Sequence, residues 1–254
     1  MLKINYIKLL ALLLITVPLW ACSKKHVKPT YTTPKETYEA SLNLLKKNNY
    51  EEARELLTSI TNRDDTKTYA PLAQLKLAES YDKDEDYDIA ITEYRKFVKL
   101  YPDSKYAPYA QYQVASIYFK QIEGPAKGYR YAEDARREFQ KLKELFPRNP
   151  YREVIELRIQ KCNNILAAHE RYVGEFYYKS KSYNSALLRF NVILDKYKSY
   201  DKTADIYYMM AECYKGLGDN KKAAEFYNKA LELSSNERKL NKKIQKGIKH
   251  IEKN

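Results

Sequence analysis

The sequence predicts an all-α protein, built as a right-handed superhelical solenoid of about five helix pairs and closed by a C-terminal capping helix. Three observations predict this fold class. The 254 residues include 26 Tyr but only 6 Gly and 9 Pro, a composition that favours helices over turn-rich β-structure. A pattern of alanines and large apolar residues recurs along the chain. The last segment has the spacing of a single amphipathic helix.

The N-terminus has the features of an export signal. Lys3 and Lys8 precede an apolar run over residues 9–17. This run is shorter than the roughly 20 residues that a membrane-spanning helix needs. A secretory signal therefore fits better than an uncleaved anchor helix. The stretch Leu19-Trp20-Ala21-Cys22 resembles a bacterial lipobox. The resemblance implies a signal peptide over residues 1–21, lipid attachment at Cys22 and, because Ser23 follows, the periplasmic side of the outer membrane.

Residues 22–35 are predicted to be the lipidated N-terminus and a flexible tether, because they contain Pro29 and Pro34 and have no apolar period. Amphipathic helices follow from Glu36 onward. We expect repeats one to three over residues 36–148, repeats four and five over 149–235, and a basic capping helix over 236–254.

Five alanines define the repeats, and a large residue stands four positions after each. The alanines are Ala53, Ala90, Ala135, Ala186 and Ala223, followed by Leu57, Tyr94, Phe139, Phe190 and Tyr227. Twelve positions before four of them stand the small residues Ser41, Ala78, Gly174 and Ala211. In the third repeat the small residue Ala115 lies further away, which indicates an insertion around residues 123–125. Together these positions resemble the tetratricopeptide repeat.

Two further features of the repeats make specific predictions. The uninterrupted helical pattern from Tyr151 to Lys181 predicts one long first helix in the fourth repeat. Gly174 lies within it, although a glycine inside a helix costs about 1 kcal/mol relative to alanine. We therefore expect Gly174 to lie where two helices cross with their backbones in contact, so closely that a side chain would push them apart.

The last helix is predicted over residues 237–253. Leu240, Ile244, Ile248 and Ile251 form one apolar stripe, and the other faces carry seven Lys or Arg against two Glu. Because a terminal repeat needs a polar outer face, the favoured interpretation is a solubilising cap. The alternative is a docking face for an acidic partner or for anionic lipid.

Motifs for catalysis, metals or cofactors are not found in the sequence. His169-Glu170 begins like a zinc-protease motif, but Val173 stands where the second His is needed. There is no phosphate-binding loop, nucleophile elbow or zinc-spaced Cys pair, so an enzyme is not predicted. Cys162 and Cys213 are expected as buried small hydrophobes rather than as a disulfide, although export would permit the bridge.

The concave face of such a solenoid is the predicted binding surface. Lysines recur in one register of four repeats, at Lys46, Lys83, Lys120 and Lys179. They could form a basic ladder for a peptide carboxylate, or only favour the helix C-terminal dipole. Aromatic residues in the groove would hold apolar side chains, unless they pack between helices. The candidate substrate groove comprises Tyr38, Leu42, Lys46, Leu72, Lys76, Lys83, Tyr109, Tyr112 and Lys120.

One stretch carries a closer resemblance. It contains His169-Glu170, Tyr172-Val173-Gly174, Phe176-Tyr177-Tyr178-Lys179, Ser182-Tyr183, Ala186 and Arg189-Phe190. With Tyr101-Pro102, Ser104 and Tyr106-Ala107, the lipobox and the tether, it resembles the BamD family of outer-membrane assembly lipoproteins. Repeat five carries the resemblance less specifically, because its residues would fit any tetratricopeptide protein.

The resemblance implies a function and partners. The partners would be a BamA-type barrel-inserting protein, contacted through its periplasmic domains, unfolded outer-membrane proteins, other assembly lipoproteins, and outer-membrane lipid through acylated Cys22. Repeats one to three would receive the C-terminal strand signal of substrates, and the C-terminal repeats would contact the barrel protein. The candidate partner surface comprises Arg171, Tyr178, Lys179, Arg189, Tyr208 and Lys215.

Two rival interpretations remain open at this point. A pilus-secretin pilotin or a cell-wall-associated adaptor would share the tether and the repeats but not the barrel partner. A periplasmic hydrolase with a helical scaffold would show hydrolytic activity, with or without a metal, and a lack of any such activity would exclude it. The formal net charge of +13 calls for an acidic partner, and export argues against nucleic acid.

Overall fold

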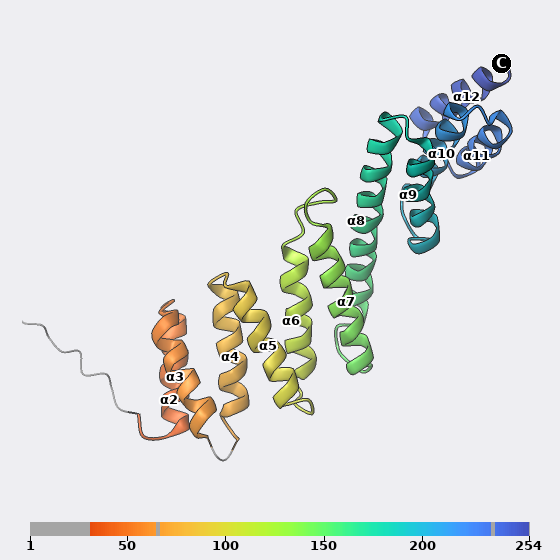
Figure 1. Ribbon diagram of the computed structural model, residues 1–254. Coiled ribbons are helices and arrows are strands. Elements are labelled where there is room, and N and C mark those ends of the chain that lie inside the picture. Colours follow the sequence, from red (N-terminus) through yellow and green to blue (C-terminus); the bar gives the residue numbers. More distant parts are fainter. Residues whose placement is uncertain (1–30, 65–66, 235–236, 254) are drawn as a thin grey trace, which may run out of the picture.

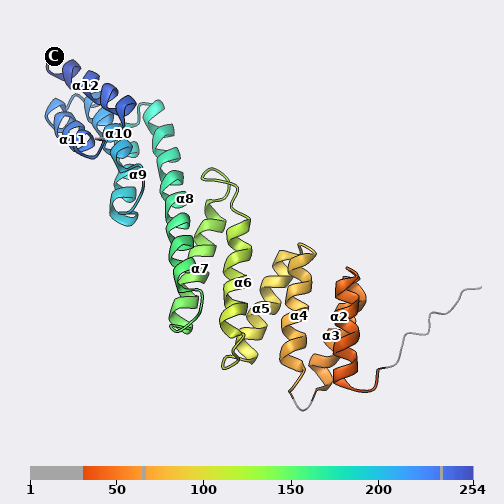
Figure 2. The same cartoon turned by 180° about the vertical axis from the view of Figure 1, so that it is seen from behind.

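The computed structural model describes residues 31–64, 67–234 and 237–253, and over these residues the chain is helical without strands. Figure 1 shows successive helix pairs lying side by side in an elongated solenoid, and Figure 2 shows the same arrangement from behind. The predicted all-α solenoid is confirmed. The signal peptide, Cys22 and the tether up to residue 30 lie outside the described residues. The helices are α2 (Pro34–Lys46), α3 (Tyr50–Arg63), α4 (Ala70–Lys83), α5 (Tyr87–Leu100), α6 (Ala107–Lys120), α7 (Tyr129–Leu145), α8 (Arg152–Lys179), α9 (Tyr183–Lys196), α10 (Thr203–Gly216), α11 (Asn220–Leu233) and α12 (Arg238–Ile251).

Helix α2 begins two residues earlier than predicted. Thr33 accepts a hydrogen bond from the backbone N–H of Glu36, and the Glu36 carboxylate accepts from the backbone N–H of Thr33. This capping box pairs donors that a helix start leaves free. Pro34 follows as the first helical residue, where its missing N–H costs nothing. The end of the predicted tether, residues 34 and 35, therefore belongs to α2.

The repeat pattern identifies the buried core correctly. All five repeat alanines are fully buried, as are Leu57, Tyr94, Phe139, Phe190 and Tyr227. Each large residue fills the space between its own helix and the preceding one, while the alanine lets the pair approach. Five apolar clusters span α2–α4, α4–α6, α6–α8, α8–α10 and α10–α12, and each shares a helix with the next. The core is therefore continuous from repeat to repeat, as expected for a solenoid in which each unit buries its neighbour.

Four of the five turns inside helix pairs have the same geometry. In each, one residue adopts a positive φ: Asn48 (58°), Glu85 (64°), Lys181 (58°) and Gly218 (79°). The backbone N–H of the next residue donates to a carbonyl one turn back in the first helix, as in Asn49 to Leu44 and Ser182 to Tyr177. This closure satisfies carbonyls at the helix end. The third pair differs because residues 121–128 form the predicted insertion.

Lys181→Gly is expected to stabilise the protein by about 0.5–1 kcal/mol. A left-handed backbone costs a residue with a Cβ about 1–2 kcal/mol, and the greater chain entropy of glycine offsets part of that gain. Urea unfolding followed by circular dichroism measures the difference. Ser180→Gly, one residue earlier at φ −79°, is the matched control and should destabilise. An unchanged or lower midpoint for Lys181→Gly would contradict the explanation.

The fourth repeat contains the predicted long helix. Helix α8 has 28 residues, and its two halves pack against different partners. Ile155, Cys162 and Leu166 belong to the cluster with α6 and α7, whereas Ala167 belongs to the cluster with α9 and α10. In Figure 1, α8 links the N-terminal pairs to the C-terminal ones. One rigid helix therefore connects the two predicted binding regions.

Gly174 lies at a close approach between α8 and α9, but the contact is not the predicted one between backbones. A Cβ added at Gly174 would lie 2.5 Å from Cε1 of Phe190. The ring of Phe190, which is fully buried, fills the space above the glycine. Gly174 therefore accommodates the large residue of its own repeat. Gly247 stands in the same relation to Tyr227, with its added Cβ 2.4 Å from the ring.

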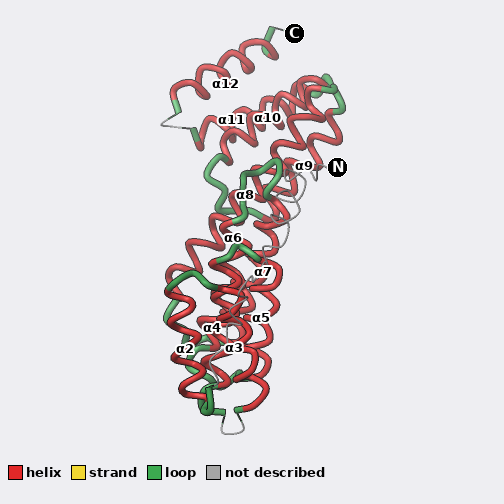
Figure 3. Tube along the Cα trace, turned by 90° about the vertical axis from the view of Figure 1, so that its left-hand side faces the viewer, coloured by secondary structure: helices red, strands yellow, loops and turns green. Residues whose placement is uncertain are grey.

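Helix α12 closes the C-terminal end, where Figure 3 shows it lying across α10 and α11. Leu240, Ile244 and Ile251 are buried against Ala211, Ala223 and Tyr227. The predicted helix and its apolar stripe are confirmed. Lys243, Lys246 and Lys249 lie beside this contact, along a pocket between α12 and α10.

Candidate partner-binding surfaces

A row of tyrosines runs over the first helices of the N-terminal repeats. The ring of Tyr38 in α2 packs against Tyr69, with centroids 5.7 Å apart. Tyr109 in α6 accepts a hydrogen bond from the Gln113 side chain at 2.8 Å. Burial raises the pKa of both Tyr38 and Tyr109, the latter to about 12, and the charge of Glu79 in α4 adds to both shifts. The carboxylate of Glu79 in α4 therefore acts electrostatically on tyrosines of both neighbouring first helices, α2 and α6.

The row continues to Tyr151, the residue immediately before α8. Tyr112 stacks on Tyr151, with ring centroids 4.4 Å apart and planes inclined by 16°. Burial and the neighbouring Tyr112 raise the pKa of Tyr151. Tyr112 also packs on Phe139. We call Tyr38, Tyr109, Tyr112 and Tyr151 the tyrosine row. Its members pack between helices and are also partly exposed, and their binding of apolar substrate side chains stays a prediction.

The other predicted groove residues are distributed less evenly. Lys76 pairs with Glu79 at 2.6 Å, and both Leu42 and Leu72 are half-buried. The predicted lysine ladder occupies one structural position, because Lys46, Lys83, Lys120 and Lys179 are each the last residue of a helix. That position fits the helix dipole. Lys120 additionally pairs with Asp82 and lies 4.2 Å from the ring centroid of Tyr87.

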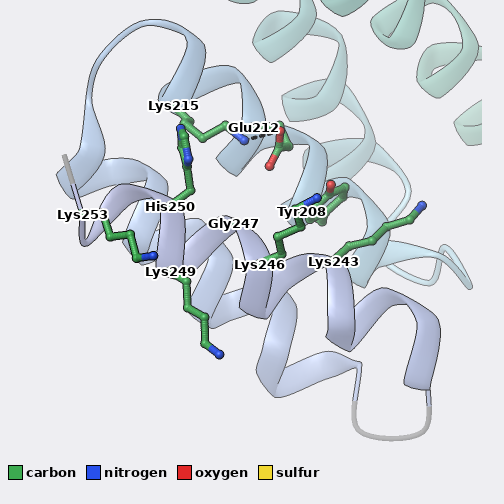
Figure 4. A pocket seen from close by; sticks show the side chains of 9 residues that line it. All are labelled: Tyr208, Glu212, Lys215, Lys243, Lys246, Gly247, Lys249, His250 and Lys253. Atoms are coloured by element: carbon green, nitrogen blue, oxygen red, sulfur yellow. Dashed lines mark hydrogen bonds and ion pairs between the residues drawn. The ribbon is translucent and has the colours of Figure 1, made fainter.

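The C-terminal repeats contain a carboxylate hub at Glu212 in α10 (Figure 4). Its carboxylate accepts from Tyr178 at 3.4 Å, from Lys215 at 2.6 Å and from Tyr227. Burial raises the pKa of Tyr178 to about 12, and the charge of Glu212 adds to the shift. Three members of the predicted partner surface, Tyr178, Tyr208 and Lys215, therefore lie around one half-buried carboxylate.

A basic pocket opens between α10 and α12 beside this hub. Its volume is about 570 Å³, and it is lined by Tyr208, Glu212, Lys215, Lys243, Lys246, Gly247, Lys249, His250 and Lys253. Figure 4 shows the lysines of α12 along one side of it. Five lysines face a single carboxylate that already accepts three hydrogen bonds. The pocket therefore attracts anionic groups.

The remaining members of the predicted partner surface do not contact Glu212, and two of them form ion pairs elsewhere in the chain. Arg171 pairs with Glu175 at 2.9 Å and Asp205 at 3.6 Å, and Arg189 pairs with Glu170 at 3.2 Å. Both guanidiniums are used within the chain, where they connect α8 to α10 and α9 to α8. Lys179 is exposed at the end of α8.

The groups with catalytic potential have structural roles. His169 stacks on Tyr129, with centroids 3.9 Å apart, and its Nδ1 lies 2.8 Å from the carbonyl oxygen of Pro125. It therefore anchors the insertion of the third repeat. Cys162 and Cys213 are buried and free, and burial raises their pKa values to about 11 and about 12. Within the described residues, no group of three or more His, Cys, Asp or Glu could hold a metal ion.

Several residues of these surfaces were not predicted. Tyr151, Glu79 and Glu212 were missed. The basic side of α12 was expected as the alternative docking face, but the pocket that Lys243, Lys246 and Lys249 line was not expected. Glu212 offered one signal, because it is an isolated acidic residue in a helix rich in Tyr and Met. The other residues become neighbours only through the packing of successive repeats.

Comparison with known proteins places the chain. A family model described as an outer membrane lipoprotein, YfiO, matches residues 31–229. The chain belongs to the YfiO family of outer membrane lipoproteins. The matched range includes the tyrosine row and the Glu212 hub, and it ends before α12.

The curated relatives of this YfiO-family chain share one name, outer membrane protein assembly factor BamD. The Rickettsia prowazekii protein is 27% identical over 217 residues, covering 85% of this chain and 86% of the relative. The Haemophilus influenzae protein is 26% identical and covers 84% and 85%. The Caulobacter vibrioides protein is 24% identical and covers 84% and 72%. Among solved structures, the TPR2AB domain of yeast Sti1 matches 87% of the chain at 13% identity and a TM-score of 0.43.

The family assignment confirms the resemblance drawn from residues 169–190, and it agrees with an outer-membrane assembly role. Among the described residues, no helix is both long enough and apolar enough to cross a membrane.

Proposed function

We propose that this protein is a non-enzymatic scaffold lipoprotein of the outer-membrane β-barrel assembly machinery, anchored through acylated Cys22. The observation that carries the proposal is the family match over residues 31–229 together with relatives named as assembly factors. Acyl chains attached to Cys22 would hold the solenoid at the periplasmic face of the outer membrane.

The tyrosine row is the proposed contact for unfolded barrel proteins. Its four rings present apolar faces and hydroxyl groups on α2, on α6 and immediately before α8. A strand of a barrel protein alternates apolar and polar side chains. Such an extended segment could place its apolar side chains against the rings, and tyrosine loses little rotamer freedom on binding.

The surface around Glu212 and the basic pocket is the proposed contact for the barrel-inserting protein of the BamA type. It lies at the opposite end of α8 from the tyrosine row, so both partners could bind at once. The lysines of α12 favour an acidic face on that partner, and complementary charge would speed and orient the encounter.

A pull-down tests the assembly role. The tagged full chain would be extracted from native envelopes in mild detergent, and its partners identified by mass spectrometry. We expect a stoichiometric outer-membrane barrel protein with periplasmic domains. Recovery of pilus-secretin or cell-wall proteins in its place would contradict the proposal and support the pilotin or adaptor alternative.

Replacing Tyr38, Leu72 and Tyr112 by Ala together is expected to weaken binding of a strand peptide at least about tenfold, because aromatic anchors dominate such contacts. Fluorescence anisotropy with a labelled peptide measures the change. Tyr131→Ala on α7, whose side chain is 39% exposed away from the row, is the control. Undiminished peptide binding by the triple variant would count against the tyrosine row.

A further inference from the structure

Helix α12 carries like charges along the side that lines the basic pocket. We call Lys243, Lys246, Lys249 and Lys253, which all belong to that lining, the pocket lysines. Each stands three or four residues from the next, and like charges at these spacings destabilise a helix. In α11 the same spacing joins opposite charges, because Lys229 pairs with Glu225 at 2.7 Å. Helix α12 therefore keeps a repulsion that an anionic ligand would relieve.

The capping role of α12 does not require these lysines. The contact with the last repeat is made by the buried residues Leu240, Ile244 and Ile251, and a solubilising outer face needs only polar side chains. Lysines near the end of a helix favour its dipole. Lys243 and Lys246, however, lie more than one turn before α12 ends at Ile251. Neither role therefore explains the lysines in the middle of the helix.

The carboxylate in the pocket does not balance the pocket lysines. Glu212 pairs with Lys215 of its own helix at 2.6 Å, and it also accepts hydrogen bonds from Tyr178 and Tyr227. Within the part of the chain that the structure describes, none of the pocket lysines forms an ion pair. Their four ammonium groups therefore line one space without a countercharge from the described residues.

The pocket is large enough for more than one anionic group. Its volume of about 570 Å³ falls within the range of roughly 300–1,000 Å³ that is typical of small-molecule sites. At a rise of about 1.5 Å per residue, the pocket lysines extend over about 15 Å of α12. Lys215 and Tyr208 line the pocket from α10. Burial and the charge of Glu212 raise the pKa of Tyr208, so its hydroxyl stays protonated and can donate to an anion.

Phosphate fits this lining better than a single carboxylate does. A flat carboxylate is matched by the fork of arginine, which the described lining does not contain. Lysine instead supplies a compact charge with three donors on a flexible stem. A phosphate group offers three acceptor oxygens and up to two negative charges, so several lysines can bind it together. We propose that the basic pocket between α10 and α12 binds a ligand that carries at least two phosphate groups.

Two sources could supply these phosphates, namely a soluble diphosphate compound and the neighbouring headgroups of an anionic phospholipid surface. The inference goes beyond the proposed contact with the barrel-type partner and does not rest on it. An acidic face of that partner would meet the same lysines, so a bound phosphate ligand would compete with the partner for them.

Inorganic pyrophosphate is the soluble probe, and its affinity for the full chain in mild detergent is measured by isothermal titration. Lys246→Gln combined with Lys249→Gln should weaken binding at least about tenfold, because it removes two charged hydrogen-bond donors from the pocket. Lys239→Gln combined with Lys242→Gln is the matched control, since both lysines are exposed on the same helix outside the pocket lining. The control should bind within about twofold of the unaltered protein, because exposed charges outside the site contribute little.

Thermal unfolding shows that the variants are folded and reports binding independently. Without ligand, the pocket variant should melt no lower than the unaltered protein, because it removes like charges from one helix. A ligand that binds only the folded state raises the melting temperature. Pyrophosphate should therefore raise it for the unaltered protein and for the control, and much less for the pocket variant.

Vesicles distinguish the two sources of phosphate. The full chain with Cys22→Ser, which has no acylation site, is sedimented with vesicles of phosphatidylglycerol and phosphatidylcholine or of phosphatidylcholine alone. All variants share the same N-terminal segment, so a difference between them reports on α12. Loss of sedimentation with the anionic vesicles in the pocket variant alone assigns the lipid source, whereas pyrophosphate binding without such a loss assigns the soluble one.

The inference would be overturned if neither pyrophosphate nor the anionic vesicles bound through the pocket lysines, or if the pocket and control variants lost binding equally. No barrel protein is present in these assays. Their failure would therefore leave the proposed partner contact standing, and a failed partner pull-down would leave the phosphate site standing.

Discussion

Gly174→Val is expected to destabilise the protein by about 3 kcal/mol, at the upper end of the typical overpacking range. Gly174 is buried in α8, and even a Cβ would lie 2.5 Å from Cε1 of Phe190. The ring has no free volume to enter, because Phe190 is itself fully buried against α10. Chemical denaturation, with the midpoint and slope both fitted, measures the loss.

A double-mutant cycle isolates the cause. Gly174→Ala gains about 1 kcal/mol of helix propensity but meets the ring, so its net effect should be destabilising. In a Phe190→Leu background the ring edge is gone, and the same substitution should become neutral or stabilising. If Gly174→Ala has the same effect on stability in both backgrounds, contact with the Phe190 ring is not the reason why position 174 requires glycine.

Gly174 also illustrates how far sequence reasoning reaches. Its position twelve residues before Ala186 predicts a close approach, because both belong to a recurrent packing pattern between adjacent helices. Helix pairs, the insertion at 123–125 and the long α8 follow from the same local pattern. The pattern does not say which group fills the space above the glycine. That group is the ring of Phe190, and only the crossing of α8 and α9 brings it there.

The candidate surfaces were harder to predict than the fold. Tyr112 and Tyr38 were expected on the groove from their register, and they lie in the tyrosine row. Their neighbour Tyr151 stands immediately before α8, and the repeat register there is shifted by the insertion that precedes it. Arg171 and Arg189 were expected as a partner surface, but ion pairs with α10 and α8 engage both. Which carboxylates these arginines meet depends on how successive helices cross, and the periodic sequence pattern does not specify that geometry.

Helix α12 has two features that can be tested separately: an apolar side that caps the last repeat and a basic side that lines the pocket. Its apolar side covers the last repeat, where Ile244 is fully buried and Gly247 approaches Tyr227. Its lysines line the pocket beside Glu212. A cap needs only the first feature, because polar residues of either sign would keep its outer face soluble.

Two variants distinguish these parts. Ile244→Ala is expected to cost about 2–5 kcal/mol, the range for truncating a fully buried side chain. Replacing Lys243, Lys246 and Lys249 by Glu should leave stability nearly unchanged but reduce capture of the barrel-type partner at least about tenfold, with the difference narrowing at high salt. Thermal unfolding and quantitative pull-downs report the two effects separately.

Lys239 and Lys242 provide the control on the same helix, since both are exposed and neither lines the pocket. Their replacement by Glu changes two charges without touching the pocket, so capture should fall by much less than with the pocket variant. A uniform loss for both sets would mean that the net charge of α12 attracts the partner and that the pocket does not position it. Undiminished capture by the pocket variant would leave α12 as a cap alone, and the partner surface would then be limited to Tyr178 and its neighbours around Glu212.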